Sequence, residues 1–279
     1  MISLITFIRF IGFTLAMMPL QLVAVTFGLA ARERFPMVWH RGVCRIFGID
    51  IEVSGKIARS KPILFVSNHT SYIDISVLGT LIKGSFIAKA DVAAWPLFGF
   101  LAKLQRTVFV DRRVSRTAHE KDRMVGRLED GDNLILFPEG TSGDGNRVLP
   151  FKSTYFALAE APIHGRPLTV QPISVAYTKL DHMPMGRRYR PYFAWYGDME
   201  LTGHLWTLMG LGRVTVSVQF HEPVTIERFA SRKKLAAHCQ RVIAEGVSEA
   251  ISGHLWREPA EKRKLLKRLR AWRRRAAAT

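Results

Sequence analysis

The sequence predicts an α/β fold in which a mixed, largely parallel sheet is flanked by helices, with membrane-associated helices at the N-terminus. The chain has 279 residues, of which 48% are hydrophobic and 23% are charged. It can therefore bury a sizeable core, and its composition excludes a largely disordered chain. Short β-branched apolar runs alternate with stretches of helical periodicity, which is typical of layered α/β domains. A long uncharged segment near the N-terminus precedes this pattern.

The N-terminal segment is long and apolar enough to cross a membrane. Residues 10–31 carry no charge, and a membrane-spanning helix needs roughly 20 such residues. Pro19 inside the run and Arg9 beside it would also allow the helix to kink or to lie in the interface. A cleaved signal peptide has a shorter apolar region of about 7–15 residues, and a buried core helix is the other alternative.

Positive charges directly follow this segment and predict its orientation. The four arginines concerned are Arg32, Arg34, Arg41 and Arg45. The positive-inside rule places that side of the membrane in the cytoplasm. Residues 38–47 then place apolar side chains at near-helical spacing, which predicts a short amphipathic helix on lipid or on a core.

The alternating pattern starts at residue 49. Seven apolar runs are predicted strands: 49–53, 63–67, 86–88, 107–110, 134–137, 170–177 and 214–220. Four stretches are predicted helices: 75–82, 118–128, 154–161 and 226–251. No internal repeat or long low-complexity linker is present. We therefore expect one domain over residues 49–255, between a membrane-associated segment (1–48) and a basic tail (256–279).

The charge balance predicts anionic partners. Lys and Arg number 41 against 23 Asp and Glu, which gives a net charge of +18, so acidic lipid surfaces, acidic proteins or nucleic acid would be attracted. A helix over residues 261–275 would surround a narrow apolar stripe with cations. That pattern suits an anionic membrane surface; docking of an acidic carrier protein and a solvated tail are the alternatives.

The metal-ligating residue types form no site pattern. Cys44 and Cys239 are too few for a disulfide framework or a four-ligand zinc site. We expect both to be small core residues in a reducing compartment. The nine histidines are scattered without an H-x-x-x-H pair, so no metal is predicted.

A histidine directly follows the predicted strand 63–67, and an aspartate follows it five residues later. Asn68 and His69 come first, Ser71 is a candidate helix cap, and Asp74 lies in the first helical turn. Residues five apart on one helix point about 140° apart, so His69 and Asp74 meet only if His69 precedes the helix. The same residues would equally form a capping pair beside a turn histidine.

A glutamate is fixed between proline and glycine after the predicted strand 134–137. Glu139, Gly140 and Thr141 form this turn, in which the glutamate has little freedom and the backbone is approachable. The polar run continues through Arg147 to Lys152. The alternative is a polar turn followed by a helix that begins near residue 153.

A third segment ends the predicted strand 107–110 with Asp111, Arg112 and Arg113. The planar guanidinium of Arg112 suits phosphate or carboxylate, because it can donate two parallel hydrogen bonds. In isolation, this segment reads as a solvated strand end.

Together, these segments resemble in order and spacing the glycerolipid acyltransferase family, which includes 1-acylglycerol-3-phosphate (lysophosphatidate) acyltransferases. The family's first block, Asn-His-x-x-x-x-Asp, matches residues 68–74. The second, an apolar strand ending in Asp-Arg, matches residues 109–112. The third, Phe-Pro-Glu-Gly-Thr, matches residues 137–141, and the fourth, a strand with a central proline, matches residues 170–173.

The resemblance implies a single acyltransferase domain that moves a fatty acyl group from a thioester to the hydroxyl of a lysolipid, converting 1-acylglycerol-3-phosphate to phosphatidate in membrane lipid biosynthesis. It implies His69 as general base and Asp74 as the residue that holds its ring. It also implies a set of substrate-binding residues: Asn68, Ser71, Arg112, Glu139, Gly140, Thr141, Arg147 and Lys152.

The resemblance implies no metal or other cofactor, and acyl-carrier protein or acyl-coenzyme A as the acyl donor. Backbone N–H groups at the start of the helix after His69 are candidate donors to the oxyanion. The enzyme would act on an anionic membrane surface at the cytoplasmic face of the inner membrane.

One position departs from the family pattern. The third block is commonly followed by an arginine that binds the acceptor's phosphate, and Ser142 stands here instead. Residues 142–147 are similar to the branch that acylates lyso-ornithine lipid, whose acceptor carries no glycerol phosphate. Arg147 or Lys152 could still supply a cation, so lysophosphatidate and lyso-ornithine lipid both stay open as acceptors.

Two other functional classes fit parts of the sequence. A basic non-enzymatic protein that binds nucleic acid or membrane would use the tail but would leave the four blocks unexplained, so we expect no nucleic-acid partner. A membrane-bound hydrolase would use His69 and Asp74 on water. Whether product formation depends on an acceptor lipid distinguishes hydrolase from transferase.

Overall fold

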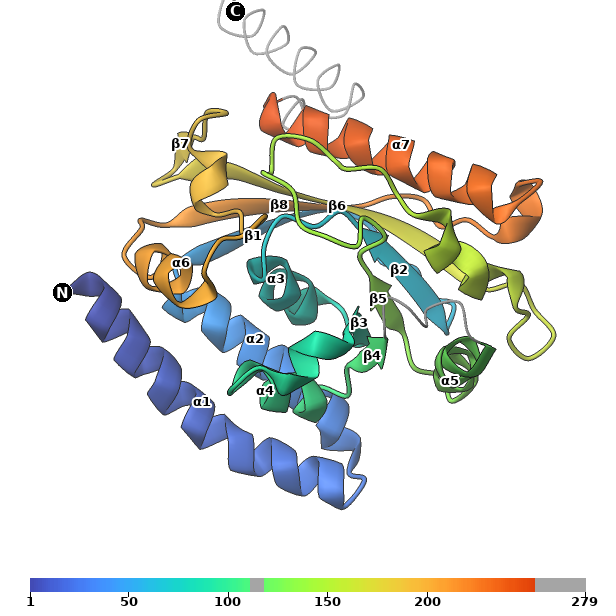
Figure 1. Cartoon of the computed structure of the whole chain (residues 1–279), viewed down its shortest axis with the longest axis horizontal. Coiled ribbons are helices and arrows are strands. Elements are labelled where there is room, and N and C mark those ends of the chain that lie inside the picture. The colour runs from blue at the N-terminus through green and yellow to red at the C-terminus, as the bar shows by residue number, and fades with distance from the viewer. Residues whose placement is uncertain (111–117, 254–279) are drawn as a thin grey trace, which may run out of the picture.

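Figure 1 shows the structure, a computed structural model of the chain. It describes residues 1–110 and 118–253. Arg112 and the helix predicted over residues 261–275 lie outside the described residues.

The elements alternate as the sequence predicts. The helices are α1 (Ile2–Thr26), α2 (Phe35–Ile46), α3 (Ile73–Leu81), α4 (Phe98–Leu104), α5 (Ala118–Glu129), α6 (Leu201–Leu208) and α7 (Arg232–Ile251). The strands are β1 (Ile49–Gly55), β2 (Ile63–Ser67), β3 (Ser85–Lys89), β4 (Val108–Val110), β5 (Leu134–Leu136), β6 (Thr169–Leu180), β7 (Met183–Pro184) and β8 (Val214–Phe220). Short 3₁₀ helices lie between them: η1 (Ala30–Glu33), η2 (Ala90–Ala94), η3 (Ser153–Glu160), η4 (Arg190–Tyr192) and η5 (Ile226–Arg228).

The strands form one mixed, largely parallel sheet, which confirms the predicted fold class. Their order is β1-β8-β6-β2-β5-β3-β4, with β7 paired to β6. Five neighbouring strands are parallel to one another, in the order β6, β2, β5, β3 and β4. β8 pairs with β6 in the antiparallel direction. The carboxyl ends of β2 and β5 therefore meet at one edge of the sheet, where α/β folds bind their ligands.

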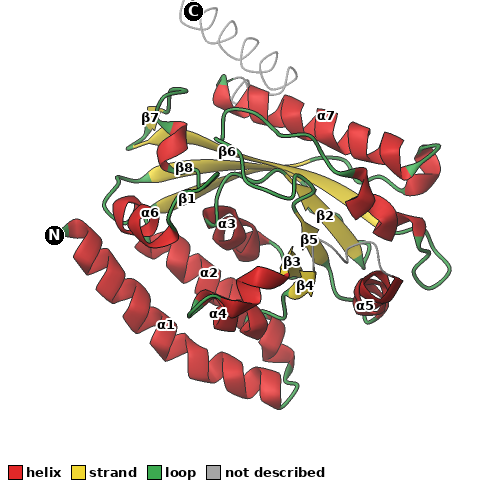
Figure 2. Ribbon diagram, in the orientation of Figure 1, coloured by secondary structure: helices red, strands yellow, loops and turns green. Residues whose placement is uncertain are grey.

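Helices cover both faces of the sheet (Figure 2). α7 lies along one face, α2, α3 and α6 lie on the other, and α1 is outermost. β2 is buried along its whole length because both of its faces are covered. Leu64 and Val66 enter the core beneath α7, whereas Ile63 and Phe65 enter the core beneath α3.

α1 differs from the predicted span at both ends. It begins at Ile2 and ends at Thr26, with Arg9 and Pro19 inside it, because the residues before Arg9 are also apolar and extend the helix. It is long and apolar enough to cross a membrane, and 22% of its most apolar 18-residue stretch is buried inside the protein. Phe10 packs against Trp39 and Phe47 of the α2 region, with ring centroids 6.3 and 5.4 Å away.

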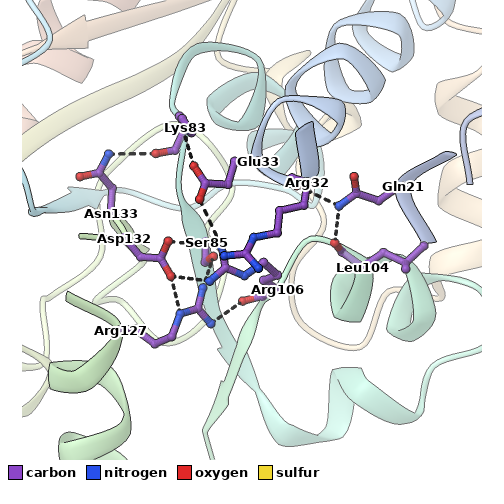
Figure 3. A network of polar contacts seen from close by, with 10 residues as sticks. All are labelled: Gln21, Arg32, Glu33, Lys83, Ser85, Leu104, Arg106, Arg127, Asp132 and Asn133. Atoms are coloured by element: carbon purple, nitrogen blue, oxygen red, sulfur yellow. Dashed lines mark hydrogen bonds and ion pairs between the residues drawn. The ribbon is translucent and has the colours of Figure 1, made fainter. Parts of the chain in front are cut away.

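A charged network fastens the N-terminal helices to the amino edge of the sheet (Figure 3). Glu33 of η1 pairs with Lys83 and lies 3.7 Å from Arg106. Arg106 in turn pairs with Asp132 at 2.8 Å, and Arg127 reaches the same carboxylate at 2.5 Å. Because Lys83 and Asp132 stand just before β3 and β5, this network lies at the edge opposite the turns that follow β2 and β5.

Two predicted helices are different in kind or extent. The helix predicted over 154–161 is the 3₁₀ helix η3, a distinction that eight residues of periodicity do not make. The helix predicted over 226–251 is divided into η5 and α7. Ser231 divides it, because its side chain accepts a hydrogen bond from the Lys234 N–H and caps a new helix. The sequence pattern does not predict the short helices α4 and α6.

Both cysteines are buried and free, which confirms their prediction as core residues. Burial raises the pKa of the Cys44 thiol to about 11 and that of the Cys239 thiol to about 12. Both groups therefore remain unreactive thiols at neutral pH.

Candidate active site

His69 and Glu139 lie side by side because they follow neighbouring parallel strands. His69 comes two residues after β2 and Glu139 three residues after β5. The backbone N–H of His69 donates a hydrogen bond of 3.1 Å to Oε1 of Glu139. The sheet thus joins two motifs that are 70 residues apart in sequence.

His69 and Asp74 form a hydrogen-bonded pair. His69 Nδ1 and Asp74 Oδ2 are 2.9 Å apart. The Asp74 side chain is fully buried, whereas 19% of the His69 side chain is exposed. A carboxylate can only accept, so Nδ1 carries the proton and Nε2 is the basic nitrogen.

Four donors surround the buried carboxylate of Asp74. Oδ2 accepts from the Thr70 N–H at 2.6 Å and from the Ser71 N–H at 2.9 Å, in addition to His69. The phenol of Tyr177 donates to Oδ1 at 2.7 Å. These bonds offset the cost of removing a charged group from water and fix the carboxylate's orientation.

The start of α3 corrects two expectations. Tyr72, not Ser71, stands at the helix cap, and the buried Oγ of Ser71 has no hydrogen-bond partner among the described residues. The Ser71 N–H nevertheless binds Asp74, which is half of the expected capping box. Because the Thr70 and Ser71 N–H groups are occupied by Asp74, the expectation that amides at this helix start receive the oxyanion is wrong for these two.

Asn68 fastens the catalytic turn, the segment over residues 68–74 that carries His69 and Asp74, to β6. Its Nδ2 donates to the Val175 carbonyl at 2.9 Å, and its Oδ1 accepts from the Val175 N–H at 2.8 Å. Asn68 and Ser71 are both buried, 4% and 0% exposed. Their role as substrate contacts stays a prediction, and their burial favours a positioning role.

Glu139 is buried at 3% exposure. Burial raises the pKa of its carboxyl group to about 8, although hydrogen bonds from the His69 and Leu149 backbones oppose the rise. Its Oε2 has no hydrogen-bond partner among the described residues. On the same turn, the Phe137 ring stacks on the His69 imidazole with centroids 4.1 Å apart, so both residues restrain His69.

The remaining predicted binding residues of this turn lie nearer the surface. Gly140 has a φ of +68°, and a Cβ there would lie 3.0 Å from Lys152 Nζ and 3.3 Å from the Tyr155 hydroxyl. A side chain at position 140 would be strained by the positive φ and would have to push these two flexible groups aside, so glycine leaves room beside two polar groups. Thr141, Arg147 and Lys152 are exposed.

Arg190 supports the loop over residues 142–147, and the sequence did not indicate it. It is 5% exposed and donates to Asn146 Oδ1 at 2.9 Å and to the Met185 carbonyl at 2.8 Å. The Gly143 N–H donates to the His69 carbonyl at 2.9 Å. The loop is thus held directly against the catalytic turn.

An apolar pocket of about 170 Å³ opens between α1, α2, α3, α4 and α6. Trp39, Val43 and Leu205 are among the apolar side chains that line it, together with Tyr72 and Phe86. Phe86 lies 6.1 Å from Phe137, centroid to centroid. The pocket is therefore one aromatic ring away from His69.

The geometry suits proton abstraction next to an apolar compartment. A partly exposed imidazole, held by a buried carboxylate, can take a proton from a hydroxyl group or from water. Among the described residues, no group of three His, Cys, Asp or Glu side chains could hold a metal ion.

Comparisons with known proteins identify the family. The Acyltransferase family profile matches residues 49–176. A lyso-ornithine lipid O-acyltransferase of Brucella abortus is 41% identical over 87% of this chain and 92% of its own length. That of Rhizobium meliloti is 39% identical over 87% and 83%. A 1-acyl-sn-glycerol-3-phosphate acyltransferase of Neisseria meningitidis is 29% identical over 79% and 85%.

A solved structure supports the fold. The crystal structure of the 1-acyl-sn-glycerophosphate acyltransferase of Thermotoga maritima matches with a TM-score of 0.52 and 22% identity, over 88% of this chain and 97% of that one. These similarities and the ordered motifs around His69 show that the chain belongs to the acyltransferase family whose members acylate lysolipids.

Proposed function

We propose that this acyltransferase transfers a fatty acyl group from a thioester to the hydroxyl of lyso-ornithine lipid. The observation that carries the chemistry is the His69–Asp74 pair, whose Nδ1–Oδ2 bond leaves Nε2 as the base. The acceptor is inferred from the relatives. Those named lyso-ornithine lipid O-acyltransferase are 34–41% identical, whereas the Neisseria 1-acyl-sn-glycerol-3-phosphate acyltransferases are 28–29% identical. Ser142, at the position of the family's usual phosphate-binding arginine, favours the same acceptor.

His69 acts as the general base in this mechanism. Nε2 takes the proton of the acceptor hydroxyl as its oxygen attacks the thioester carbonyl carbon. The tetrahedral intermediate then collapses, the C–S bond breaks, and the imidazolium returns the proton to the leaving thiolate. The products are an ester and a free thiol, so no serine or cysteine nucleophile is required.

Asp74 stabilises the imidazolium that forms during attack, as the aspartate of a serine protease triad does. Tyr177 and the two turn amides hold that carboxylate. Glu139 holds His69 by its backbone, because its carboxyl group accepts a hydrogen bond from the His69 N–H. We assign Asn68, Ser71 and Glu139 to positioning the catalytic turn.

The substrate-binding residues divide between chain and head group. The apolar pocket beside Phe86 suits an acyl chain, since its lining is almost entirely hydrocarbon. Thr141, Arg147 and Lys152 stand at the exposed end of the site and suit the acceptor's polar head. Gly140 has no side chain to fill the space beside Lys152. From the family motif, we propose Arg112 as a further residue that binds the polar head.

The membrane side of the molecule is proposed from α1. Large apolar side chains on its outer face are exposed, including Leu4, Ile8 and Leu15 at 50, 61 and 55%. We propose that α1 lies in the inner membrane with the catalytic domain at its cytoplasmic, anionic surface. Acyl-carrier protein or acyl-coenzyme A supplies the acyl group, since both anions suit a chain of net charge +18.

A panel of acceptors tests this function. Purified membranes that contain the protein would be given lyso-ornithine lipid, lysophosphatidate, another lysophospholipid or no acceptor, each with acyl-carrier protein or acyl-coenzyme A as donor. We expect at least tenfold higher kcat/KM on lyso-ornithine lipid, about 1.4 kcal/mol. Tenfold preference for lysophosphatidate would overturn the acceptor assignment, and acyl release without acceptor would indicate a hydrolase.

A further inference from the structure

The loop after Thr141 places charged groups of both signs beside the catalytic turn. Asp144 stands between Gly143, whose N–H donates to the His69 carbonyl at 2.9 Å, and Gly145. Gly145 packs so closely on Thr70 that a Cβ at this position would lie 3.0 Å from the Thr70 methyl carbon. Asp144 is therefore held between two glycines that contact the catalytic turn, one at His69 and the other at Thr70.

The loop is held in shape by hydrogen bonds that also bring in a second segment. Asp144 Oδ1 accepts from the Asn146 N–H at 3.0 Å. Asn146 Nδ2 donates to the Arg187 carbonyl at 3.2 Å, and Asn146 Oδ1 accepts from the buried Arg190 at 2.9 Å. Asn146 thus joins the Asp144 loop to the segment that carries Arg187.

Three charged groups of this cluster are left without an ion pair. Asp144, Arg147 and Arg187 make no salt bridge within 4.0 Å to any side chain of residues 1–110 or 118–253. Partial burial would raise the pKa of Asp144, but hydrogen bonds from Asn146 and the charges of Arg147 and Arg187 outweigh this and lower it. The cluster therefore offers an ionised carboxylate that lies within electrostatic reach of Arg147, Arg187 and the buried Arg190 but makes no ion-pair contact with any of these three residues.

We propose that this cluster is a head-group site that recognises a zwitterion, in which Asp144 binds an ammonium group and Arg147 and Arg187 bind a carboxylate. The proposal rests on the proposed function and names the chemistry by which that acceptor is selected. Ornithine has two amines and one carboxylate, so attaching a fatty chain to one amine leaves an ammonium and a carboxylate. A phosphate monoester would meet the same arginines but would be repelled by Asp144.

The test combines an enzyme variant with a matched change in the acceptor. Asp144→Asn removes the charge. Its amide oxygen can still accept the Asn146 backbone N–H, whereas the 3.2 Å bond from Asn146 Nδ2 to Asp144 Oδ2 is lost. The acceptors are lyso-ornithine lipid and the same lipid with its free amine acetylated. We expect the wild-type enzyme to show at least tenfold lower KM for the free amine, and Asp144→Asn to reduce this preference to less than about threefold. Arg187→Gln should raise KM for both acceptors, since both keep the carboxylate.

Controls separate this proposal from its premise and from misfolding. Asp130→Asn changes an exposed aspartate before β5, at the opposite edge of the sheet, and should keep the wild-type preference. Asp144→Ser, which also keeps an acceptor for the turn, should behave as Asp144→Asn. Equal KM values for the two acceptors with the wild-type enzyme, or an unchanged preference in both Asp144 variants, would overturn the proposal. Failure of the proposed function would show separately, as a wild-type preference for lysophosphatidate.

Discussion

Tyr177 donates a 2.7 Å hydrogen bond to Oδ1 of Asp74, the carboxylate oxygen that His69 does not use. Both side chains are at most 1% exposed, and Asp74 is 103 residues before Tyr177 in sequence. β6 delivers the phenol and α3 delivers the carboxylate. Tyr177 therefore extends the His69–Asp74 pair into a three-residue chain of hydrogen bonds.

We expect Tyr177→Phe to lower kcat about tenfold or more and to leave the acceptor KM nearly unchanged. Hydrogen bonds to charged groups contribute about 1.5–3 kcal/mol, and the phenol touches Asp74 rather than the pocket surface. Tyr192→Phe, at an exposed tyrosine, is the matched control. An unchanged kcat in Tyr177→Phe would reduce Tyr177 to a core residue.

The stability of the protein should depend on the ionisation of Glu139. The pKa of this carboxyl is raised to about 8 by burial, from an ordinary value of 4.5. Between these pH values the folded chain holds a proton that the unfolded chain has lost, so its stability falls as pH rises through this window. Glu139→Gln cannot ionise and should lose this part of the pH dependence.

Thermal unfolding followed by tryptophan fluorescence at pH 5, 7 and 9 measures this effect. The melting temperature of Glu139→Gln should rise relative to that of the wild type as pH increases. Glu129→Gln, at an exposed position, should follow the wild type at every pH. A difference between Glu139→Gln and wild type that is constant with pH would contradict the buried, protonated carboxyl.

Two glycines in helices should respond to alanine in opposite directions. A Cβ at Gly79 in α3 would lie 2.3 Å from Cδ2 of His40, which is 1% exposed, so Gly79→Ala should destabilise the fold by about 1–3 kcal/mol. A Cβ at Gly126 in α5 would meet no atom within 4 Å, and Gly126→Ala should stabilise by about 0.5–1 kcal/mol. Denaturant unfolding measures both changes. Equal shifts of the same sign would contradict the packing of α2 on α3.

Membrane binding should depend on the outer face of α1. Replacing Leu4, Ile8 and Leu15 together by serine removes three exposed apolar side chains, each of which gains about 1.5–3 kcal/mol when fully buried. We expect more than tenfold weaker co-sedimentation with anionic vesicles. Met183→Ser, at an exposed apolar residue on β7, is the control. Unchanged binding by the triple variant would show that α1 does not contact the bilayer.

Local features of the site and fold were predictable from the sequence, and long-range ones were not. β2 and β8 match their predicted bounds, because strands buried on both faces read as continuous apolar runs. His69 and Asp74 could be paired because one turn joins them. Tyr177 reaches the site because β6 pairs with β2, and Arg190 reaches it because η4 packs against the loop over residues 142–147. No local pattern marks either residue.

The most direct test of the account is acceptor-dependent acyl transfer by wild-type protein and His69→Ala in matched membranes. Labelled acyl thioester and lyso-ornithine lipid are supplied together, and the labelled ester is separated from free fatty acid. We expect the wild type to form the ester only when acceptor is present, and His69→Ala to lose about 10²–10⁴ in rate while remaining folded and membrane-bound. Ester formation by His69→Ala at more than about a tenth of the wild-type rate would contradict the role of His69 as general base.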